Sequence, residues 1–265
     1  MPTPTESLTD QQIEQYHRDG FLMLECVADE DELRWVREIY DRLFEEKAGF
    51  EEGAQFDLAG TDEGKAGLPQ VLGPSRFAPE LKEAPSTRRI RRIAEQLHGP
   101  LDDSCGEHMI YKPAGYGAAT PWHQDQAYHN PHYDYEKANF WMPLDDATPE
   151  NGCLRFVPGS HKWEVKPHHH INNDPRIHGL EVDDPEQYDA MAVDCPVPAG
   201  GVSIHAAYLM HAAGPNHSDR PRRAWIRAYQ APPVRRETPI DDYWNREETP
   251  TVRAQRARAA EKDAG

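Results

Sequence analysis

The stretch that decides how this chain folds is PWHQDQ, residues 121–126, in which one residue separates a histidine from an aspartate. In an extended strand, alternate side chains point to the same face. His123 and Asp125 could therefore reach one metal ion together. A third ligand would have to come from a distant strand, so the pattern predicts a fold that pairs strands far apart in the sequence.

A second informative stretch is HAAGPNHSDRPR, residues 211–222. His211 would complete a set of two imidazoles and one carboxylate, which leaves about three coordination positions open, as in non-haem Fe(II) oxygenases. Arg222 has a planar guanidinium that can hold the far carboxylate of a dicarboxylate co-substrate in a bidentate pair. The two stretches together predict a metal site with a cationic residue for an anion.

Both assignments in this second stretch have a competitor. His205 precedes His211 in the apolar run VSIHAAYLMH, residues 202–211, and either imidazole could face the metal. Arg223 directly follows Arg222, and neighbouring strand residues face opposite sides, so only one of the two guanidinium groups can point inward. The residues alone leave both choices open.

Five blocks of the sequence resemble the phytanoyl-CoA dioxygenase (PhyH-like) family of Fe(II)/2-oxoglutarate-dependent oxygenases. A lone His-x-Asp is common by chance, but five blocks in the family's order and spacing are specific. They cover roughly residues 105 to 230 and read YKP (111–113), PWHQDQ (121–126), WMPLDD (141–146), NGCLRFVPGSH (151–161) and HAAGPNHSDRPR (211–222).

The expected fold class is α+β with a mainly β core. Helical periodicity at the start, followed by many short strands, indicates the class, and the resemblance implies a double-stranded β-helix, the cupin-like jelly-roll, with N-terminal helices on its outer face. We expect one oxygenase domain over residues 1–265. It would comprise a helical part (1–104), the jelly-roll core (105–230) and a C-terminal extension (231–265).

Capping residues and periodicity predict the individual elements. Helices are expected from Thr9 to near Gly20, from Asp29 to about Lys47, and over residues 88–97 with Ser86 or Thr87 as the cap. Residues 48–85 show little periodicity and are predicted to form a long loop. The predicted strands are 21–24, 107–112, 138–144, 153–157, 191–197, 202–206 and 223–230.

The resemblance assigns roles to individual residues. It implies that His123, Asp125 and His211 bind iron, because the residues that follow match the family only if counted from His211. It implies that Arg222 binds 2-oxoglutarate. Family relatives that halogenate replace the aspartate with a small residue, so Asp125 favours hydroxylation or another oxidation.

Three further residues are assigned to the co-substrate pocket by the same resemblance. Trp141 is expected near 2-oxoglutarate, with a plain core aromatic as the alternative. Gln124 is expected to contact the co-substrate or to support a metal ligand, and Tyr111 is expected to line the pocket. For Tyr111, packing or surface exposure is the alternative.

The implied function is hydroxylation of an unactivated C–H bond in a small-molecule substrate. The cofactors would be Fe(II), 2-oxoglutarate as co-substrate, and O2, with release of succinate and CO2. Desaturation, cyclisation or demethylation would use the same cofactors and remains an alternative. A second alternative is a non-oxidative cupin-type metal-binding protein or isomerase. The residues that contact substrate lie on loops and follow no general pattern, so the sequence does not identify the substrate.

The charge balance restricts the partners. The chain has 29 Lys and Arg against 46 Asp and Glu, a formal net charge of −17, which argues against nucleic acid and against anionic membrane surfaces. It also disfavours a polyanion such as CoA, although Lys166, Arg176 and His178 could form a local cationic groove. With no apolar run and no signal-like start, a cytoplasmic protein is expected. Monomer and homodimer both remain open.

Two other patterns invite a metal-site interpretation. The scattered cysteines Cys26, Cys105, Cys153 and Cys195 form no C-x-x-C pair, which predicts reduced, mostly buried thiols. His168, His169 and His170 are adjacent, so an extended backbone cannot direct all three at one ion. A solvent-exposed loop is predicted there, with a lid over the substrate as the alternative.

Overall fold

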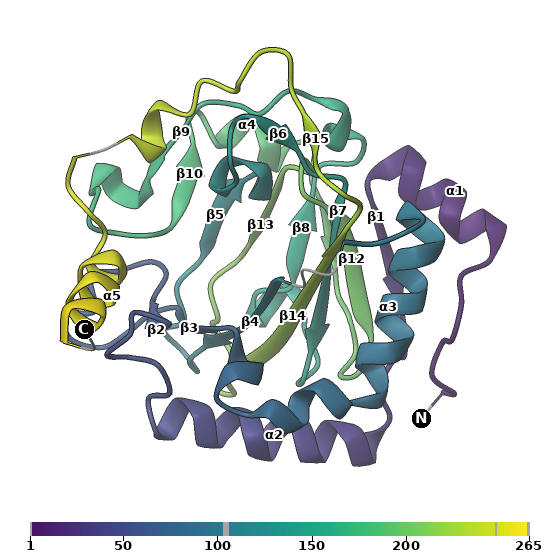
Figure 1. The fold of residues 1–265 in the computed structure, drawn as a ribbon. Coiled ribbons are helices and arrows are strands. Elements are labelled where there is room, and N and C mark those ends of the chain that lie inside the picture. Colours follow the sequence, from purple (N-terminus) through teal and green to yellow (C-terminus); the bar gives the residue numbers. More distant parts are fainter. Residues whose placement is uncertain (1, 103–105, 247, 264–265) are drawn as a thin grey trace.

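The core consists of two antiparallel sheets in the computed structural model, which describes residues 2–102, 106–246 and 248–263 (Figure 1). The larger sheet has the strand order β1-β12-β7-β14-β4-β3-β2. Its strands are β1 (Phe21–Leu24), β2 (Gln55–Asp57), β3 (Pro69–Leu72), β4 (Gly106–Lys112), β7 (Lys137–Pro143), β12 (Val202–Ala206) and β14 (Arg222–Gln230).

The smaller sheet has the order β11-β8-β13-β5. Its strands are β5 (Thr120–His123), β8 (Leu154–Phe156), β11 (Val193–Cys195) and β13 (His211–Ala213). Apolar residues of the two sheets share one buried cluster, with Trp141 and Ile226 from the larger sheet and Leu154 and Phe156 from the smaller. Two facing sheets built from strands distant in sequence form the expected jelly-roll, so the prediction of a cupin-like double-stranded β-helix is confirmed.

Strict alternation along the strands gives the larger sheet two different faces. In β14, Arg222, Ala224 and Ile226 lie on the inner side toward the smaller sheet, whereas Trp225 and Arg227 lie on the outer side. This alternation is the period-2 pattern of a strand that is buried on both faces. The inner side carries the polar residues of the site, and the outer side packs against helices.

Three N-terminal helices lie beside the larger sheet, as Figure 1 shows, and the second and third of them, α2 and α3, cover its outer face. They are α1 (Asp10–Asp19), α2 (Glu30–Glu45) and α3 (Pro85–His98). Thr9 forms the expected N-cap of α1 in a capping box with Gln12, and Gly20 ends this helix with φ 84°. Asp29 caps α2 through its carboxylate. The predicted placement of helices on the outer face is confirmed.

Two predictions for the N-terminal part were wrong in detail. The third helix begins at Pro85 and not after Ser86 or Thr87, because proline suits the first helical position and no side-chain cap is needed. The region 48–85 is not one loop. It contains β2 and β3, which extend the larger sheet beyond β4.

The remaining elements lie around one end of the jelly-roll and along its side. Two short pairs, β9 (His168–His170) with β10 (Leu180–Val182) and β6 (Tyr133–Asp134) with β15 (Val234–Arg235), flank that end. The other helices are α4 (Glu186–Asp189), α5 (Val252–Asp263) and the 3-10 helices η1 (Pro74–Arg76), η2 (Pro79–Glu83), η3 (Asp125–Tyr128), η4 (Pro149–Asn151), η5 (Ser160–Lys162), η6 (Ile171–Asn173) and η7 (Tyr243–Asn245).

The C-terminal extension contacts the rest of the chain. Arg253 and Arg256 of α5 donate hydrogen bonds to the carbonyls of Gly53 and Gln55, and Arg256 forms an ion pair with Asp62. None of the helices in the described ranges is long and apolar enough to cross a membrane. Cys26, Cys153 and Cys195 are buried free thiols, as predicted, and Cys105 lies outside the described residues.

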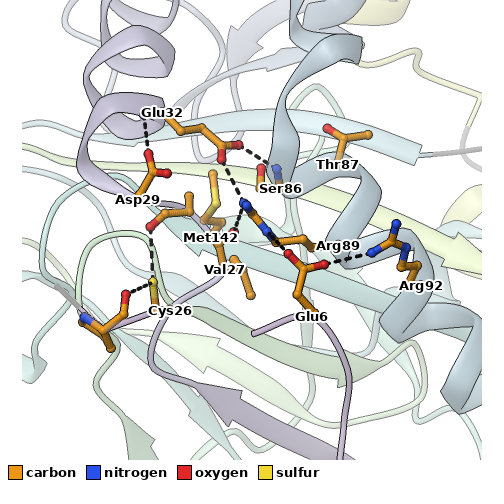
Figure 2. Close-up of polar contacts among 12 residues, drawn as sticks. Glu6, Cys26, Val27, Asp29, Glu32, Ser86, Thr87, Arg89, Arg92 and Met142 are labelled. Atoms are coloured by element: carbon orange, nitrogen blue, oxygen red, sulfur yellow. Dashed lines mark hydrogen bonds and ion pairs between the residues drawn. The ribbon is translucent and has the colours of Figure 1, made fainter. Parts of the chain in front are cut away.

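The buried carboxylate of Glu32 links the second and third helices, α2 and α3 (Figure 2). Glu32 of α2 is 5% exposed and accepts a hydrogen bond from the backbone N–H of Ser86 at 2.8 Å. It also accepts from Arg89 of α3 at 3.3 Å. Arg227, on the outer face of β14, donates to the hydroxyls of Ser86 and Thr87. This network fixes α3 to both α2 and the sheet.

We expect Glu32→Ala to lower the free energy of unfolding by about 1–3 kcal/mol, because it leaves a buried N–H group and part of Arg89 without an acceptor. Urea-induced unfolding followed by circular dichroism measures the change. Arg34→Ala is the matched control on the same helix. It removes only an exposed ion pair with Asp31 and should change stability by less than about 1 kcal/mol. Equal effects of the two substitutions would contradict the structural role of Glu32.

Candidate active site

The pairing of β13 with β5 places His211 directly opposite His123. β5 ends at His123, Gln124 keeps an extended backbone with φ −119° and ψ 129°, and Asp125 is the first residue of η3. Because Gln124 is extended, the side chains of His123 and Asp125 still point to the same side. Two short strands and one extended residue therefore bring the three side chains together.

The three side chains offer ligand atoms that all lie within 4.8 Å of one another. Oδ1 of Asp125 is 3.5 Å from Nε2 of His123 and 3.8 Å from Nε2 of His211. The centroids of the two imidazole rings are 4.1 Å apart. Two imidazole nitrogens and one carboxylate oxygen therefore converge on one point, in the arrangement typical of a metal site with open positions.

Backbone carbonyls orient both imidazoles. Nδ1 of His123 lies 2.8 Å from the carbonyl oxygen of Pro121, and Nδ1 of His211 lies 2.9 Å from that of Leu209. A proton on each Nδ1 makes these hydrogen bonds and leaves Nε2 free to bind a metal, the usual support for a histidine ligand. The carbonyls belong to residues two positions before each histidine, Pro121 within β5 and Leu209 in the bend before β13, so the local backbone provides the orientation.

The electrostatics of the cluster suit a cation. Burial, reinforced by neighbouring His123, lowers the pKa of His211 well below its ordinary value, so this imidazole is neutral at neutral pH. Burial alone would raise the pKa of Asp125, but the imidazoles of His211, His123 and His205 outweigh it and hold the pKa of this carboxyl well below its usual range. A neutral imidazole such as that of His211 and an ionised carboxylate are the forms that bind metals.

His205, the competitor of His211, also faces this cluster but contacts the other carboxylate oxygen. Its Nε2 lies 3.4 Å from Oδ2 of Asp125, whereas His123 and His211 face Oδ1. Among the described residues, the set with converging ligand atoms comprises His123, Asp125 and His211 and omits His205. The geometry thus favours His211 over His205 as the third ligand, a choice that the sequence alone left open.

Arg222 lies in the same cavity as the metal cluster. Arg222 is 1% exposed, and its Nε and Nη1 have no hydrogen-bond partner among the described residues. The guanidinium carbon lies 5.0 Å from the ring centre of Trp141, which is also buried. Burial lowers the pKa of Arg222 to about 10, so the group remains charged at neutral pH. A buried cation with unused N–H groups requires an anion.

Arg223 points the opposite way, as strand alternation predicted. It binds Asp145 at 2.7 Å and Asp41 of α2 at 2.9 Å, on the outer side of the sheet. Lys112, opposite Arg222 in the strand pairing, is a second buried basic side chain on the inner side, and burial together with the charge of Arg222 lowers its pKa well below the ordinary value. Its Nζ donates to the carbonyls of Ala118 and Gly214 at 2.5 and 2.8 Å. Of the three basic side chains, Arg222 is the one whose nitrogens face the cavity without a partner in the described structure.

The structure places Gln124 and Tyr111 outside the cavity, where Tyr111 packs as its stated alternative allowed and Gln124 lies between two of the candidate ligands. The buried side chain of Gln124 donates to the carbonyl of Tyr208 and accepts from the backbone N–H of Lys166, because a residue between two same-side ligands must point the other way. Tyr111 faces α2, where its ring packs against that of Phe44. Neither lines the cavity.

The tract at residues 168–170 also differs from the prediction. It is the strand β9, and the side chain of His168 is fully buried. Nε2 of His168 accepts a hydrogen bond from the backbone N–H of Gln124, and Nδ1 lies 2.6 Å from the carbonyl of Lys166. His168 therefore supports the backbone between the metal-cluster residues from outside the cavity, and the exposed-loop prediction was wrong for it.

The cavity has a volume of about 280 Å³ and contains both the cluster and Arg222. One part of its wall is apolar, whereas the other carries several polar groups that the sequence reasoning did not find. Period 2 along the predicted strand 138–144 could have found Asn139, which shares a face with Trp141. The lining residues are Leu58, Gln70, Leu72, His108, Ile110, Thr120, His123, Asp125, Tyr128, His129, Lys137, Asn139, Trp141, Leu154, His178, His205, His211, Ala213, Arg222 and Ile226.

Comparison with known protein families gives a match over most of the chain. The model described as "Phytanoyl-CoA dioxygenase (PhyH)" matches residues 16–224. The chain belongs to this family. The resemblance inferred from the five sequence blocks is thereby confirmed, and so is the class of enzyme: an Fe(II)/2-oxoglutarate-dependent dioxygenase, whose cofactors are Fe(II), 2-oxoglutarate and O2.

Individual PhyH-family relatives differ in their named activities. The chain is 32% identical over 152 residues to a probable alpha-ketoglutarate-dependent hypophosphite dioxygenase of Stutzerimonas stutzeri, a match that covers 54% of this chain and about half (51%) of that protein. It is 27% identical over 259 residues to phytanoyl-CoA dioxygenase of Arabidopsis thaliana, covering 83% of this chain and 88% of the relative.

Solved structures of similar proteins confirm the fold. EvdO2 of Micromonospora carbonacea var. aurantiaca superimposes with a TM-score of 0.78 at 37% identity, covering 92% of this chain and 99% of EvdO2. A second structure of EvdO2, complexed with 2-oxoglutarate, matches with a TM-score of 0.77 at 36% identity, covering 89% of this chain and 96% of that one. The family's cofactors fit the donor set found here, since the converging nitrogens and oxygen suit Fe(II) and the unpaired Arg222 suits a carboxylate.

Proposed function

We propose that this enzyme hydroxylates an unactivated C–H bond of a small polar molecule, with His123, Asp125 and His211 as the iron ligands and Arg222 as the residue that binds 2-oxoglutarate. The proposal rests on one observation: the same cavity contains the converging ligand set and the buried guanidinium of Arg222, which has no partner among the described residues. The metal site alone would not distinguish an oxygenase of this class from other metal-binding proteins with a cupin-like fold.

The assignment of the three ligands rests on convergence and orientation. Both imidazoles turn Nε2 toward Oδ1 of Asp125, with the proton on Nδ1 engaged by a backbone carbonyl. His205 lacks this arrangement, because its Nδ1 has no hydrogen-bond partner in the described structure and its Nε2 faces Oδ2. A ligand set on one side of the ion leaves the opposite positions for co-substrate and O2.

The assignment of Arg222 rests on charge. A carboxylate bound to its planar guanidinium would use the N–H groups that have no partner among the described residues and would neutralise a charge held in an apolar environment. Trp141 packs over the guanidinium and limits its rotation. Trp141 would thereby position the co-substrate through Arg222, in agreement with the role expected from the sequence.

When bound, Fe(II) with 2-oxoglutarate supplies the oxidant for the overall reaction R–H + O2 + 2-oxoglutarate → R–OH + succinate + CO2. The chain contributes orientation and an environment with little water. Asp125 keeps the position that halogenating relatives leave to a small residue, which favours hydroxylation or another oxidation over halogenation. Apolar residues such as Ile110, Leu154 and Ile226 form part of the wall and exclude water near the cluster.

The proposed substrate class follows from the size and polarity of the cavity. About 280 Å³ must hold the co-substrate and the reacting part of the substrate, so only a small molecule or the end of a larger one fits. His108 and His129 contribute neutral imidazoles, since burial lowers the pKa of each to about 4, and these can donate and accept hydrogen bonds.

The cationic groove that a CoA ester would need is not supported by the structure. Of the three residues considered for it, only His178 lines the cavity. The ammonium of Lys166 lies over the ring of Trp163, and Arg176 forms an exposed ion pair with Asp174. A small polar substrate is therefore favoured over an acyl-CoA thioester.

We expect His123→Ala, Asp125→Ala and His211→Ala each to abolish Fe(II) binding at micromolar protein while leaving the fold intact, because each removes one of three ligands. Anaerobic Fe(II) titration and the visible absorption that develops on adding 2-oxoglutarate measure this, with circular dichroism as the fold control. His205→Ala should retain Fe(II) binding, though weakened. Full binding by His211→Ala together with complete loss in His205→Ala would show that the third ligand is His205.

We expect Arg222→Ala to weaken 2-oxoglutarate binding by roughly 30-fold to several-thousand-fold, the equivalent of losing a buried charge-assisted contact of about 2–5 kcal/mol. Fe(II) affinity should barely change. Arg222→Lys should restore only part of the loss, because an ammonium cannot reproduce the planar guanidinium. Arg223→Ala is the matched control on the same strand and should leave co-substrate binding unchanged. Unaltered 2-oxoglutarate affinity in Arg222→Ala would disprove the assignment.

The reaction type is tested with the Fe(II) enzyme, 2-oxoglutarate, O2 and a panel of small polar metabolites, with acyl-CoA thioesters as the comparison set. We expect succinate formation to be stimulated by a member of the polar panel, and its product to gain the mass of one oxygen atom. Loss of two hydrogens would indicate desaturation or cyclisation instead. Stimulation by acyl-CoA thioesters alone would contradict the proposed substrate class.

A further inference from the structure

The two oxygens of the Asp125 carboxylate have different surroundings. Oδ1 faces the Nε2 atoms of His123 and His211, at 3.5 and 3.8 Å. Oδ2 points away from them and accepts a hydrogen bond of 2.6 Å from Nδ2 of Asn139. Nε2 of His205 lies 3.4 Å from the same oxygen. One oxygen is thus directed at the proposed metal position, and the other is hydrogen-bonded to Asn139 and lies next to His205, both from the larger sheet.

Strand register explains how these two side chains meet. Asn139 of β7 and His205 of β12 are direct partners in the antiparallel pairing of the two strands. Both point to the inner face, and both are buried, with 5% and 3% of their surfaces exposed. The larger sheet therefore presents the side-chain nitrogens of Asn139 and His205 to the carboxylate of Asp125, which lies at the start of η3, just after β5.

The position of His205 fits a donor role. Its Nε2 lies 3.4 Å from Oδ2, so the tautomer protonated on Nε2 places an N–H group beside that oxygen and leaves Nδ1 as an acceptor, for which the described structure offers no hydrogen-bond partner. The ring of Phe156 lies 5.4 Å away, centre to centre, and packs against the imidazole. The amide of Asn139 can offer the carboxylate only its N–H groups. Both groups can stabilise Oδ2 without competing for the metal.

We propose that Asn139 and His205 are positioning residues that hold Asp125 as a monodentate ligand through Oδ1, which keeps the other coordination positions open for the co-substrate and O2. This inference rests on the proposed assignment of Asp125 as a ligand. Turning Oδ2 toward the metal would break the bond to Asn139 and leave that buried amide without its acceptor. Groups that hydrogen-bond a ligand in this way control its orientation and the metal affinity.

The test uses Co(II) binding to the full-length metal-free protein, followed by equilibrium dialysis and by the visible absorption of Co(II), which reports coordination number. Asn139→Leu keeps the side-chain volume and removes the donor. We expect it to weaken Co(II) binding by about 10–100-fold and to alter the absorption as the carboxylate becomes free to bind through both oxygens. His205→Phe, which retains a ring against Phe156, should shift the spectrum in the same direction, and His205→Gln should restore part of the affinity.

The matched control is Ser203→Ala. Ser203 lies on the same strand and face as His205, is fully buried, and its hydroxyl makes no hydrogen bond within the described structure. This variant should bind Co(II) with parental affinity and spectrum. If circular dichroism shows that Asn139→Leu does not fold, the affinity and spectrum of His205→Phe alone decide the test.

Two different failures can be told apart. Loss of Co(II) binding in Asp125→Ala, with parental affinity and absorption in both Asn139→Leu and His205→Phe, would overturn the positioning role and leave the ligand assignment intact. Parental Co(II) binding in Asp125→Ala would instead overturn the proposed function itself. Weakened binding with an altered spectrum in the Asn139 and His205 variants supports the inference.

Discussion

The antiparallel pairing of β5 with β13 is the constraint on which the site depends. It sets His123 opposite His211, and because the side-chain period of a strand is two, a slip of one residue would turn one imidazole to the other face. The carbonyls that orient the two rings belong to Pro121, within β5, and to Leu209, in the bend that leads into β13. The register therefore sets the distance between the two ligands, and the adjoining backbone sets the orientation of their rings.

Much of the fold could be predicted from the sequence because the signals are local. The caps at Thr9 and Asp29 and the apolar and aromatic residues of the predicted strand 223–230 each depend on neighbouring residues alone. The strands β2 and β3 could not be predicted in the same way, since they are only three and four residues long and show no alternation between buried and exposed positions. Their structure depends on β4, which supplies the hydrogen bonds of the larger sheet.

For the site, strand periodicity was a better guide than motif matching. The spacing that predicted His123 and Asp125 on one side also requires Gln124 to face away, which argues against the co-substrate contact that the resemblance offered as one of its two roles. The same alternation, applied from Trp141, would have found Asn139. The contact between Asn139 and His205 could not be derived from the sequence, because it depends on the register between β7 and β12, which no local pattern specifies.

The strand order also bears on how the chain acquires its structure. β1 forms its hydrogen bonds with β12, with Phe21 opposite His205, so the edge of the larger sheet nearest the N-terminus cannot form until most of the chain is available. Contacts between residues so far apart in sequence slow folding, because loop closure precedes the stabilising pairing. During synthesis, α2 therefore emerges long before β12 and β14, whose residues share its buried apolar cluster, and these strands cannot cover its apolar face until they arrive.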